Sequence, residues 1–273
     1  MGSVEAAFFD LDRTLISTSS SLALSRPLYR AGLVTRAQLL RGAYGQLAYV
    51  LLGADERRME RMRDRMLALS RGWDRGEVEE LVRDVVVDLV DPFVYQEGLD
   101  LIAEHLAAGR RAFIVSSSPE EIVRPLAAHL GIADVLATRA RIVDGRYTGE
   151  LAFYCAGPNK AEAMREVAAR DGIDLGASYA YSDSIADLPM LRAVGHPVAV
   201  NPDRDLRREA EASDWPVLAF ERPVRLRTRI ARTAAQPRTQ ATAGIVAGIT
   251  AAAVVGWILV RARRAEHGAA RAA

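Results

Sequence analysis

A short apolar run near the N-terminus ends on two acidic residues, and this feature constrains the fold more than any other. Residues 6–9 are Ala-Ala-Phe-Phe, with no alternation of polar and apolar side chains. Such a run is typical of a parallel strand that is buried on both faces. Ligands of open parallel sheets bind beyond the carboxyl ends of the strands. The run therefore predicts that Asp10 and Asp12 lie in a binding crevice, although a turn with two solvated acids would give the same pattern.

Polar side chains follow strand-like runs at three later places in the chain. The segments are the strand 112–115 before Ser116 and Ser117, the strand 133–138 with an Asp-Gly hairpin at 141–148 before Lys160, and the strand 179–181 before Asp183 and Asp187. The serines stand at the entrance to a predicted helix, 120–130, where unpaired N–H groups and the helix dipole favour an anion. A serine-rich helix cap is the alternative interpretation.

Lys160 is the only lysine among the 36 basic residues, and the others are arginines. An ammonium group is a compact point charge, whereas a guanidinium is broad and planar. A site that needs a point charge would explain why one lysine is kept, although chance would also explain it.

Composition excludes some classes of function. The chain has 273 residues and a net charge of +1, so no global positive field favours nucleic acid, and we expect no nucleic-acid partner. Cys155 is the only cysteine, which excludes an intrachain disulfide framework. Half of the residues are apolar, enough for a sizeable core and more than one domain.

The segment 17–95 contains helical patterns and no convincing strand. Helices are predicted at 35–52 and 55–69, and Asp74-x-x-Glu77 resembles a capping box that opens a helix through Val90. The arginines of 55–69 could attract an anionic substrate or lipid headgroups, or form a solvated face. We therefore expect a helical insert between two strands of the core.

The C-terminal part is different in character. An arginine-rich linker, 221–240, precedes twenty uncharged residues at 241–260 and a basic tail at 261–273. Twenty residues at about 1.5 Å each would cross a ~30 Å hydrocarbon core. We predict a single-pass transmembrane helix at 241–260, with the catalytic domain on the cytoplasmic side of the cell membrane because more arginines precede the helix than follow it.

The sequence Asp10-x-Asp12-x-Thr14 after an apolar strand resembles the first motif of the haloacid dehalogenase (HAD) superfamily. With Ser116, Lys160 and the Asp183/Asp187 pair, the chain resembles subfamily IB, the phosphoserine-phosphatase-like branch. The resemblance implies an α/β fold in which a doubly wound, Rossmann-like parallel-sheet core (1–16 and 96–220) carries a helical C1 cap at 17–95.

The resemblance also implies roles for the motif residues. Asp10 would be the nucleophile that forms an aspartyl-phosphate, and Asp12 would act as general acid and base. Mg²⁺ would bind Asp10, the backbone carbonyl of Asp12, and Asp183, with Asp187 orienting a water or a neighbouring ligand. The phosphate oxygens would be held by Ser116, Ser117 and Lys160.

Three departures from the family pattern concern the substrate. Ser19 stands where phosphoserine phosphatases carry a glutamate that grips the substrate amino group, Ala186 stands where Asn is usual, and Arg13 replaces a small residue. The sequence therefore predicts a membrane-tethered, Mg²⁺-dependent phosphomonoester hydrolase whose substrate is small or amphiphilic, such as a lysophospholipid-like phosphate. A phosphotransferase to an alcohol and a membrane-bound interaction module with an inactive HAD fold are the alternatives.

Overall fold

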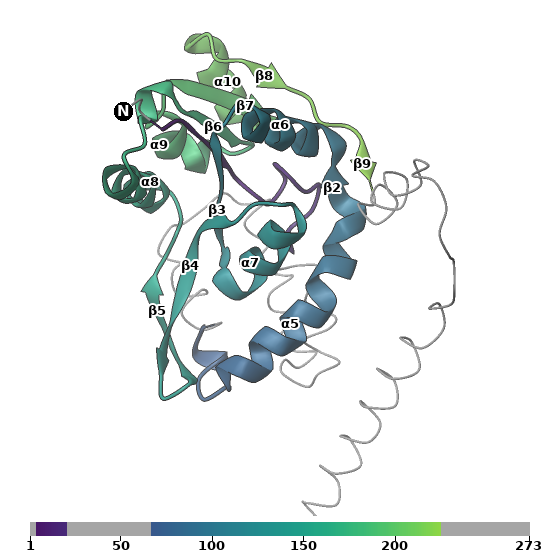
Figure 1. The fold of residues 1–273 in the computed structure, drawn as a ribbon, viewed down its shortest axis with the longest axis vertical. Helices are drawn as coiled ribbons and strands as arrows, with labels where there is room; N and C mark the ends of the chain where they lie inside the picture. The colour runs from purple at the N-terminus through teal and green to yellow at the C-terminus, as the bar shows by residue number, and fades with distance from the viewer. Residues whose placement is uncertain (1–3, 21–66, 225–273) are drawn as a thin grey trace, which may run out of the picture. The chain divides into compact units, whose positions relative to one another are not determined.

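The strand β1 (Ala6–Phe9) lies inside a seven-stranded sheet, as its apolar sequence predicts. In the computed structural model, which describes residues 4–20 and 67–224, the strand order is β5-β4-β3-β1-β6-β7-β8. Neighbouring strands are parallel except for β4 and β5 (Figure 1). The other strands are β3 (Arg111–Pro119), β4 (Asp134–Val143), β5 (Arg146–Phe153), β6 (Tyr179–Ser182), β7 (His196–Val200) and β8 (Val217–Leu218).

Helices cover both faces of this sheet, and the pleat of β1 divides the core between them. Ala7 and Phe9 belong to a buried cluster with α5 (Arg75–Val90), α6 (Gln96–Ala107) and α7 (Glu120–His129). Ala6 and Phe8 belong to a second cluster with α8 (Pro158–Asp171), α9 (Leu188–Leu191) and α10 (Arg204–Ala212). In Figure 1, α8 and α9 lie on one side of the strands and α6 on the other. The predicted doubly wound parallel core is confirmed.

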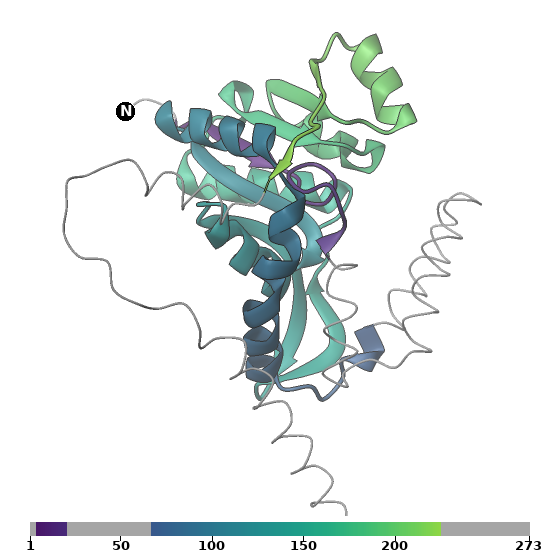
Figure 2. The ribbon, with the colours of Figure 1, turned by 90° about the vertical axis from the view of Figure 1, so that its right-hand side faces the viewer.

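The strand and hairpin predicted at 133–138 and 141–148 are in fact one long hairpin. β4 runs without interruption to Val143 and pairs antiparallel with β5 across a turn at Asp144 and Gly145, which both have positive φ, at 50° and 73°. Asp-Gly favours such a tight turn, so this part of the prediction is correct. Figure 2 shows the hairpin extending alongside α5, and the Gly72 N–H donates to the Tyr147 carbonyl at 2.8 Å.

The helix α5 joins the predicted insert to the core. Asp74 is its N-cap and accepts a hydrogen bond from the Glu77 N–H at 3.2 Å, as the capping-box pattern predicts. Val82, Val86 and Val90 are buried in the first core cluster. The last part of the predicted cap segment is therefore packed on the core.

Two short strands were not predicted. β2 (Val94–Tyr95) pairs antiparallel with β9 (Pro223–Val224), so the expectation that 17–95 contains no strand is wrong at its end. A two-residue strand is too short to show a periodic pattern, and its partner is distant in sequence. Arg222 also forms an ion pair with Glu97 at 2.9 Å. Contacts with the core thus continue beyond residue 220, where the basic linker was predicted to begin.

The predicted helix 35–52, most of 55–69, and the predicted span 241–260 lie outside the described residues. Within 4–20 and 67–224, the structure contains no helix long and apolar enough to cross a membrane. The remaining short elements are the 3₁₀ helices η1 (Asp91–Phe93), η2 (Leu175–Ala177) and η3 (Ile185–Asp187).

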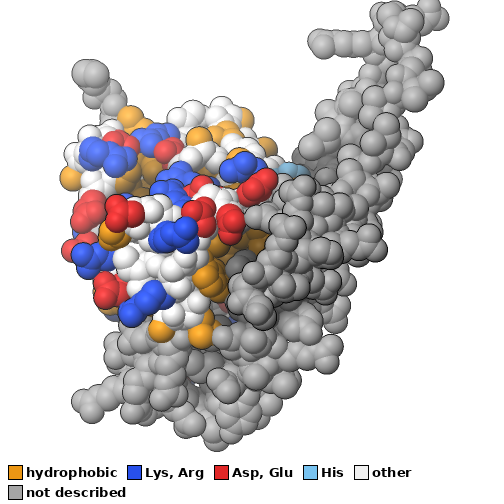
Figure 3. Space-filling model, turned by 90° about the horizontal axis from the view of Figure 1, so that it is seen from below, with side chains coloured by type: hydrophobic (Ala, Val, Ile, Leu, Met, Phe, Trp, Pro, Cys, Tyr) orange, Lys and Arg blue, Asp and Glu red, His pale blue; other side chains and the backbone are white. Residues whose placement is uncertain are grey.

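Charged side chains of both signs are interspersed on the face shown in Figure 3. Elsewhere in the described residues, Arg75 pairs with Glu79 and Arg124 with Glu120 along the surface of one helix each. Exposed pairs of this kind contribute little to stability. The mixture of positive and negative side chains is consistent with the net charge of +1. The absence of a nucleic-acid partner stays a prediction.

A buried histidine makes stability depend on pH. His105 in α6 is 3% exposed; its Nε2 lies 2.7 Å from the Tyr181 hydroxyl, and Nδ1 has no hydrogen-bond partner in the described part of the chain. Burial, and secondarily Arg110, lower the pKa of His105. The unfolded chain therefore binds a proton that the folded protein excludes, and the free energy of unfolding falls as pH drops below about 6.5.

We expect His105→Gln to reduce this pH dependence, because glutamine keeps a polar group near Tyr181 and does not titrate. Urea unfolding at pH 7.5 and pH 5.5 measures it. The wild-type protein should lose more stability between these two values than the variant does. Equal losses would show that His105 does not titrate between the folded and unfolded states.

Candidate active site

Two of the predicted acids, which follow β1 and β6, lie together with the single lysine. Lys160 Nζ lies 2.6 Å from Asp10 Oδ1 and 2.7 Å from Asp187 Oδ2. Lys160 is 3% exposed and both acids are buried, so this is a buried network of three ionisable groups. Asp187 Oδ2 also accepts a hydrogen bond from the Ser182 hydroxyl at 2.7 Å. The predicted juxtaposition of Asp10, Lys160 and Asp187 is thus present in the structure.

Local sequence explains how Lys160 reaches the acids. Gly157 caps α8 with a φ of 52°, a conformation that glycine adopts without strain, and Pro158 begins the helix. Lys160 consequently lies in the first turn. Asp187 lies in η3, which follows β6. The Ser184 hydroxyl caps η3 by accepting a hydrogen bond from the Ala186 N–H at 3.3 Å, and this bond fixes the turn that carries Asp187.

Thr14, the last residue of the first motif, lies between the two acids that the resemblance assigns to the metal. Its hydroxyl is 3.2 Å from Asp10 Oδ2 and 3.3 Å from Asp183 Oδ1. A hydroxyl has a single proton to donate, so it can satisfy only one of these carboxylates at a time. The hydroxyl therefore cannot donate to Asp10 and Asp183 at the same time.

The pKa values of the two acids reflect this environment. Burial raises the pKa of Asp10 to about 8; Lys160 opposes the rise, and Asp187 and Asp183 add to it. Burial also raises the pKa of Asp183 to about 6, with Arg13 opposing. Nearby acids raise the pKa of Lys160 despite its burial, so its charged form is favoured. A cation beside Asp10 and Asp183 would favour their ionised forms.

The oxygen donors fit Mg²⁺ better than a softer metal. Within 4–20 and 67–224, no three Asp, Glu, His or Cys side chains surround one metal position. Two carboxylates and the Asp12 carbonyl would hold a cation that keeps several of its waters, as Mg²⁺ does. The buried carboxylate pair that shares one hydroxyl is consistent with such an ion.

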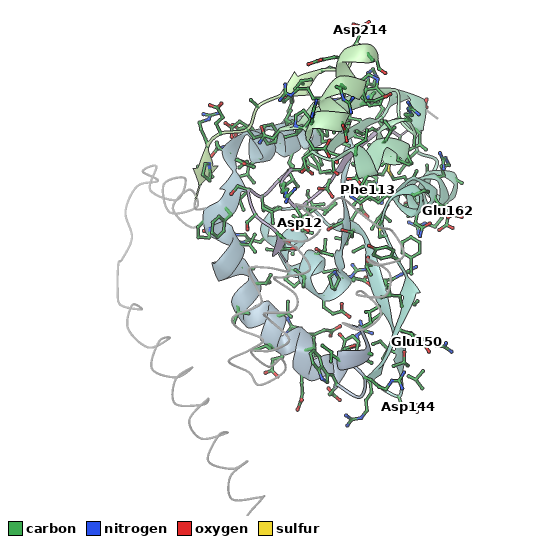
Figure 4. All side chains as sticks on the ribbon, turned by 180° about the vertical axis from the view of Figure 1, so that it is seen from behind. Asp12, Phe113, Asp144, Glu150, Glu162 and Asp214 are labelled. Carbon is green, nitrogen blue, oxygen red and sulfur yellow. The ribbon has the colours of Figure 1, made fainter. Side chains whose placement is uncertain are left out.

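Asp12 is held by two contacts that the sequence did not predict. Its Oδ1 accepts from the Ser20 N–H at 2.5 Å, and its Oδ2 accepts from the Ser118 hydroxyl at 2.8 Å. Arg13, which follows, has a φ of 66°, a left-handed conformation that is strained for a residue with a side chain. In Figure 4, Asp12 lies well away from Asp144 at the hairpin turn.

The three serines after the second core strand differ in their surroundings. β3 continues through them to Pro119, beyond the predicted strand end at 115, and α7 begins at Glu120 as predicted. Ser116 is buried, and its hydroxyl accepts from the Ser118 N–H at 3.1 Å. The Ser117 side chain is exposed, and its carbonyl accepts from the Thr138 hydroxyl at 2.7 Å. The phosphate-binding roles of Ser116 and Ser117 stay predictions.

Comparison with known proteins agrees with this geometry. A family model described as haloacid dehalogenase-like hydrolase matches residues 7–192. A probable phosphatase of Mycobacterium tuberculosis (strain ATCC 25618 / H37Rv) is 51% identical over 257 residues, covering 94% of this chain and 89% of the relative. A phosphoserine phosphatase of the same strain is 34% identical over 233 residues, covering 85% of this chain and 73% of the relative.

Among solved structures, a protein of unknown function from Bordetella pertussis Tohama I matches with a TM-score of 0.70 and 29% identity. The match covers 80% of this chain and 99% of that protein. Fold, motif residues and relatives agree, and the chain belongs to the haloacid dehalogenase-like hydrolases, in their phosphoserine-phosphatase-like branch, and is a phosphatase.

Proposed function

We propose that this phosphatase hydrolyses a phosphomonoester in two displacements at Asp10, with the aid of Mg²⁺. The observation that carries the proposal is the buried contact of Lys160 with both Asp10 and Asp187, beside a separately held Asp12. A nucleophile and a proton donor thus occupy distinct environments at the end of the same strand. This separation is what a reaction through an aspartyl-phosphate requires.

In the first step, Asp10 attacks phosphorus and Asp12 gives a proton to the leaving oxygen. In the second step, Asp12 takes a proton from the water that attacks the phosphoryl group on Asp10. Lys160, within 2.6 Å of Asp10, would stabilise the charge that spreads over the phosphoryl oxygens. A bound Mg²⁺ would neutralise the repulsion between the acids and the phosphate dianion.

Chelation tests the metal requirement. We expect excess EDTA to reduce turnover of 4-nitrophenyl phosphate by at least ~10²-fold, because Asp10 and Asp183 would otherwise repel the substrate. Added Mg²⁺ should restore the activity, and Ca²⁺, which tolerates irregular coordination, should restore it poorly. Full activity in excess chelator would remove the metal from the mechanism.

We further propose that the segment 241–260 tethers the enzyme to the cell membrane as a single-pass helix, with the catalytic domain cytoplasmic. Arginines of the preceding linker would each contribute about 1 kcal/mol of attraction to an anionic leaflet. A surface-held site would favour amphiphilic, lysophospholipid-like phosphomonoesters. The phosphoserine phosphatase relative supports a small phosphorylated metabolite as the other substrate class, although Ser19 replaces the glutamate that implies phosphoserine.

Truncation after Arg229 tests both parts of this proposal, since the core contacts reach Val224. The shortened protein should move from the membrane fraction to the soluble fraction and keep its turnover of 4-nitrophenyl phosphate. The full chain on vesicles should prefer lysophosphatidate over phosphoserine. A preference for phosphoserine would show that the C-terminal segment localises the enzyme without selecting its substrate. A full chain found in the soluble fraction would exclude the tether.

A further inference from the structure

Each carboxylate oxygen of Asp12 has a hydrogen-bond donor from a different part of the chain. The N–H on Oδ1 belongs to Ser20, eight residues later, and the hydroxyl on Oδ2 belongs to Ser118, 106 residues later. The carboxylate cannot rotate about its own axis without breaking one of these bonds. The two donors therefore fix the orientation of the proposed acid–base group.

The two serines are also in contact with each other. Ser118 Oγ lies 3.0 Å from Ser20 Oγ, either can be the donor, and both residues are buried. A hydroxyl donates and accepts, whereas a backbone N–H only donates. The donor on Asp12 Oδ1 is therefore fixed. The Ser118 hydroxyl, in contrast, can donate either to Asp12 Oδ2 or to Ser20 Oγ. It can therefore donate to Oδ2 when Asp12 is ionised and to Ser20 when Oδ2 carries a proton.

We propose that Ser118 and Ser20 are positioning residues that hold Asp12 for proton transfer in both steps of the reaction; this inference rests on the acid–base role proposed for Asp12. Before the first step, the proton is on Asp12 Oδ2 and the Ser118 hydroxyl donates to Ser20. The Asp10–phosphorus bond then forms, the bond from phosphorus to the leaving oxygen breaks, and the Asp12 proton goes to that oxygen. The Ser118 hydroxyl turns and donates to the newly charged Oδ2, which is the arrangement in the structure.

The second step reverses these changes. The water oxygen bonds to phosphorus, the Asp10–phosphorus bond breaks, and one water proton passes to Asp12 Oδ2. The Ser118 hydroxyl then returns to Ser20. No other reactant is required, and the serines themselves gain or lose no net proton.

The test compares two aryl phosphates that differ in the basicity of the leaving group, in the full-length protein. Phenolate from phenyl phosphate is a poor leaving group that needs a proton, whereas 2,4-dinitrophenolate leaves without one. Since kcat/KM covers only the steps up to the aspartyl-phosphate, it reports the first proton transfer. We expect Ser118→Ala to lower kcat/KM by ~10- to 100-fold for phenyl phosphate and by less than ~3-fold for 2,4-dinitrophenyl phosphate.

Three further variants separate positioning from structure. Ser118→Thr keeps the hydroxyl and should recover most of the activity on phenyl phosphate. Ser20→Ala keeps the N–H bond to Asp12 and should show the same selectivity with a smaller loss. Ser178→Ala is the matched control. Ser178 is also buried, its hydroxyl makes two hydrogen bonds, and it directly precedes the amino end of β6, away from the strand end that carries the site. This variant should affect both substrates equally.

Asp12→Asn distinguishes failure of this inference from failure of the proposed function. If Asp12→Asn selectively loses phenyl phosphate turnover and Ser118→Ala slows both substrates equally, the serines do not position Asp12, and the proposed acid–base role stands. If Asp12→Asn itself slows both substrates equally, the proposed acid–base role is wrong, and the inference falls with it.

Discussion

Asp10→Asn is expected to abolish steady-state turnover of every phosphomonoester while leaving the protein folded. The amide is almost isosteric with the carboxylate but is not a nucleophile, so no aspartyl-phosphate can form. The loss should exceed ~10⁴-fold, the upper range for a single proton-transfer group, because the whole covalent route is removed. Thermal unfolding should change little, because Lys160 keeps Asp187 as its charged partner when Asp10 becomes an amide.

Steady-state kinetics with 4-nitrophenyl phosphate and circular dichroism measure the two halves of this prediction. Asp214 is exposed and lies well away from Asp12 in Figure 4, so the Asp214→Asn variant provides a control with the same chemical change. It should match wild type in both measurements. Activity of Asp10→Asn within a few-fold of wild type would rule out Asp10 as the nucleophile.

Replacing Lys160 is expected to damage both activity and stability. Lys160→Met leaves Asp10 and Asp187 buried without their shared cation, and loss of one partner of a buried ion pair typically costs about 3–5 kcal/mol. Lys160→Arg keeps the charge, but a planar guanidinium does not fit a position that is 3% exposed and within 2.7 Å of two carboxylates. We expect kcat/KM to fall by at least ~10²-fold in both variants.

A double variant separates the two effects. Lys160→Met combined with Asp187→Asn removes one of the unpaired charges, so it should regain part of the stability lost in Lys160→Met, without regaining activity. Urea unfolding and kcat/KM on one aryl phosphate measure this. If Lys160→Arg is as active as wild type, the site does not need a lysine at this position, and the presence of a single lysine in the sequence has no functional meaning.

The sequence was most informative where apolar strands end on polar residues. The run before Asp10 is apolar without alternation and fully buried, and the strand before Asp183 is buried after its first residue, so these strands identified the parallel core and the edge that carries the site. Lys160 could be found because it is the only lysine and follows a Gly-Pro helix start. These signals are local, and a parallel sheet brings strand ends together regardless of the details of packing.

The contacts that sequence reasoning missed join residues that lie far apart in the chain. Ser118 contacts Asp12 through a register between β3 and β1 that no short motif encodes. Ser20 is one of several serines in Ser17–Ser20, and only the path of the chain makes its N–H the one that reaches Asp12. The same limit applies to β2 and β9, which are each two residues long and pair from distant parts of the chain.

Chemical trapping of the aspartyl-phosphate tests the central claim most directly. Asp12→Asn slows the second step, so the intermediate should accumulate when this variant is mixed with 2,4-dinitrophenyl phosphate. Acid quenching, borohydride reduction and peptide mass spectrometry then locate the acyl phosphate as homoserine. The account predicts homoserine at residue 10 alone, close to one per protein chain; homoserine at another acid, or release of dinitrophenolate over many turnovers with residue 10 unmodified, would contradict it.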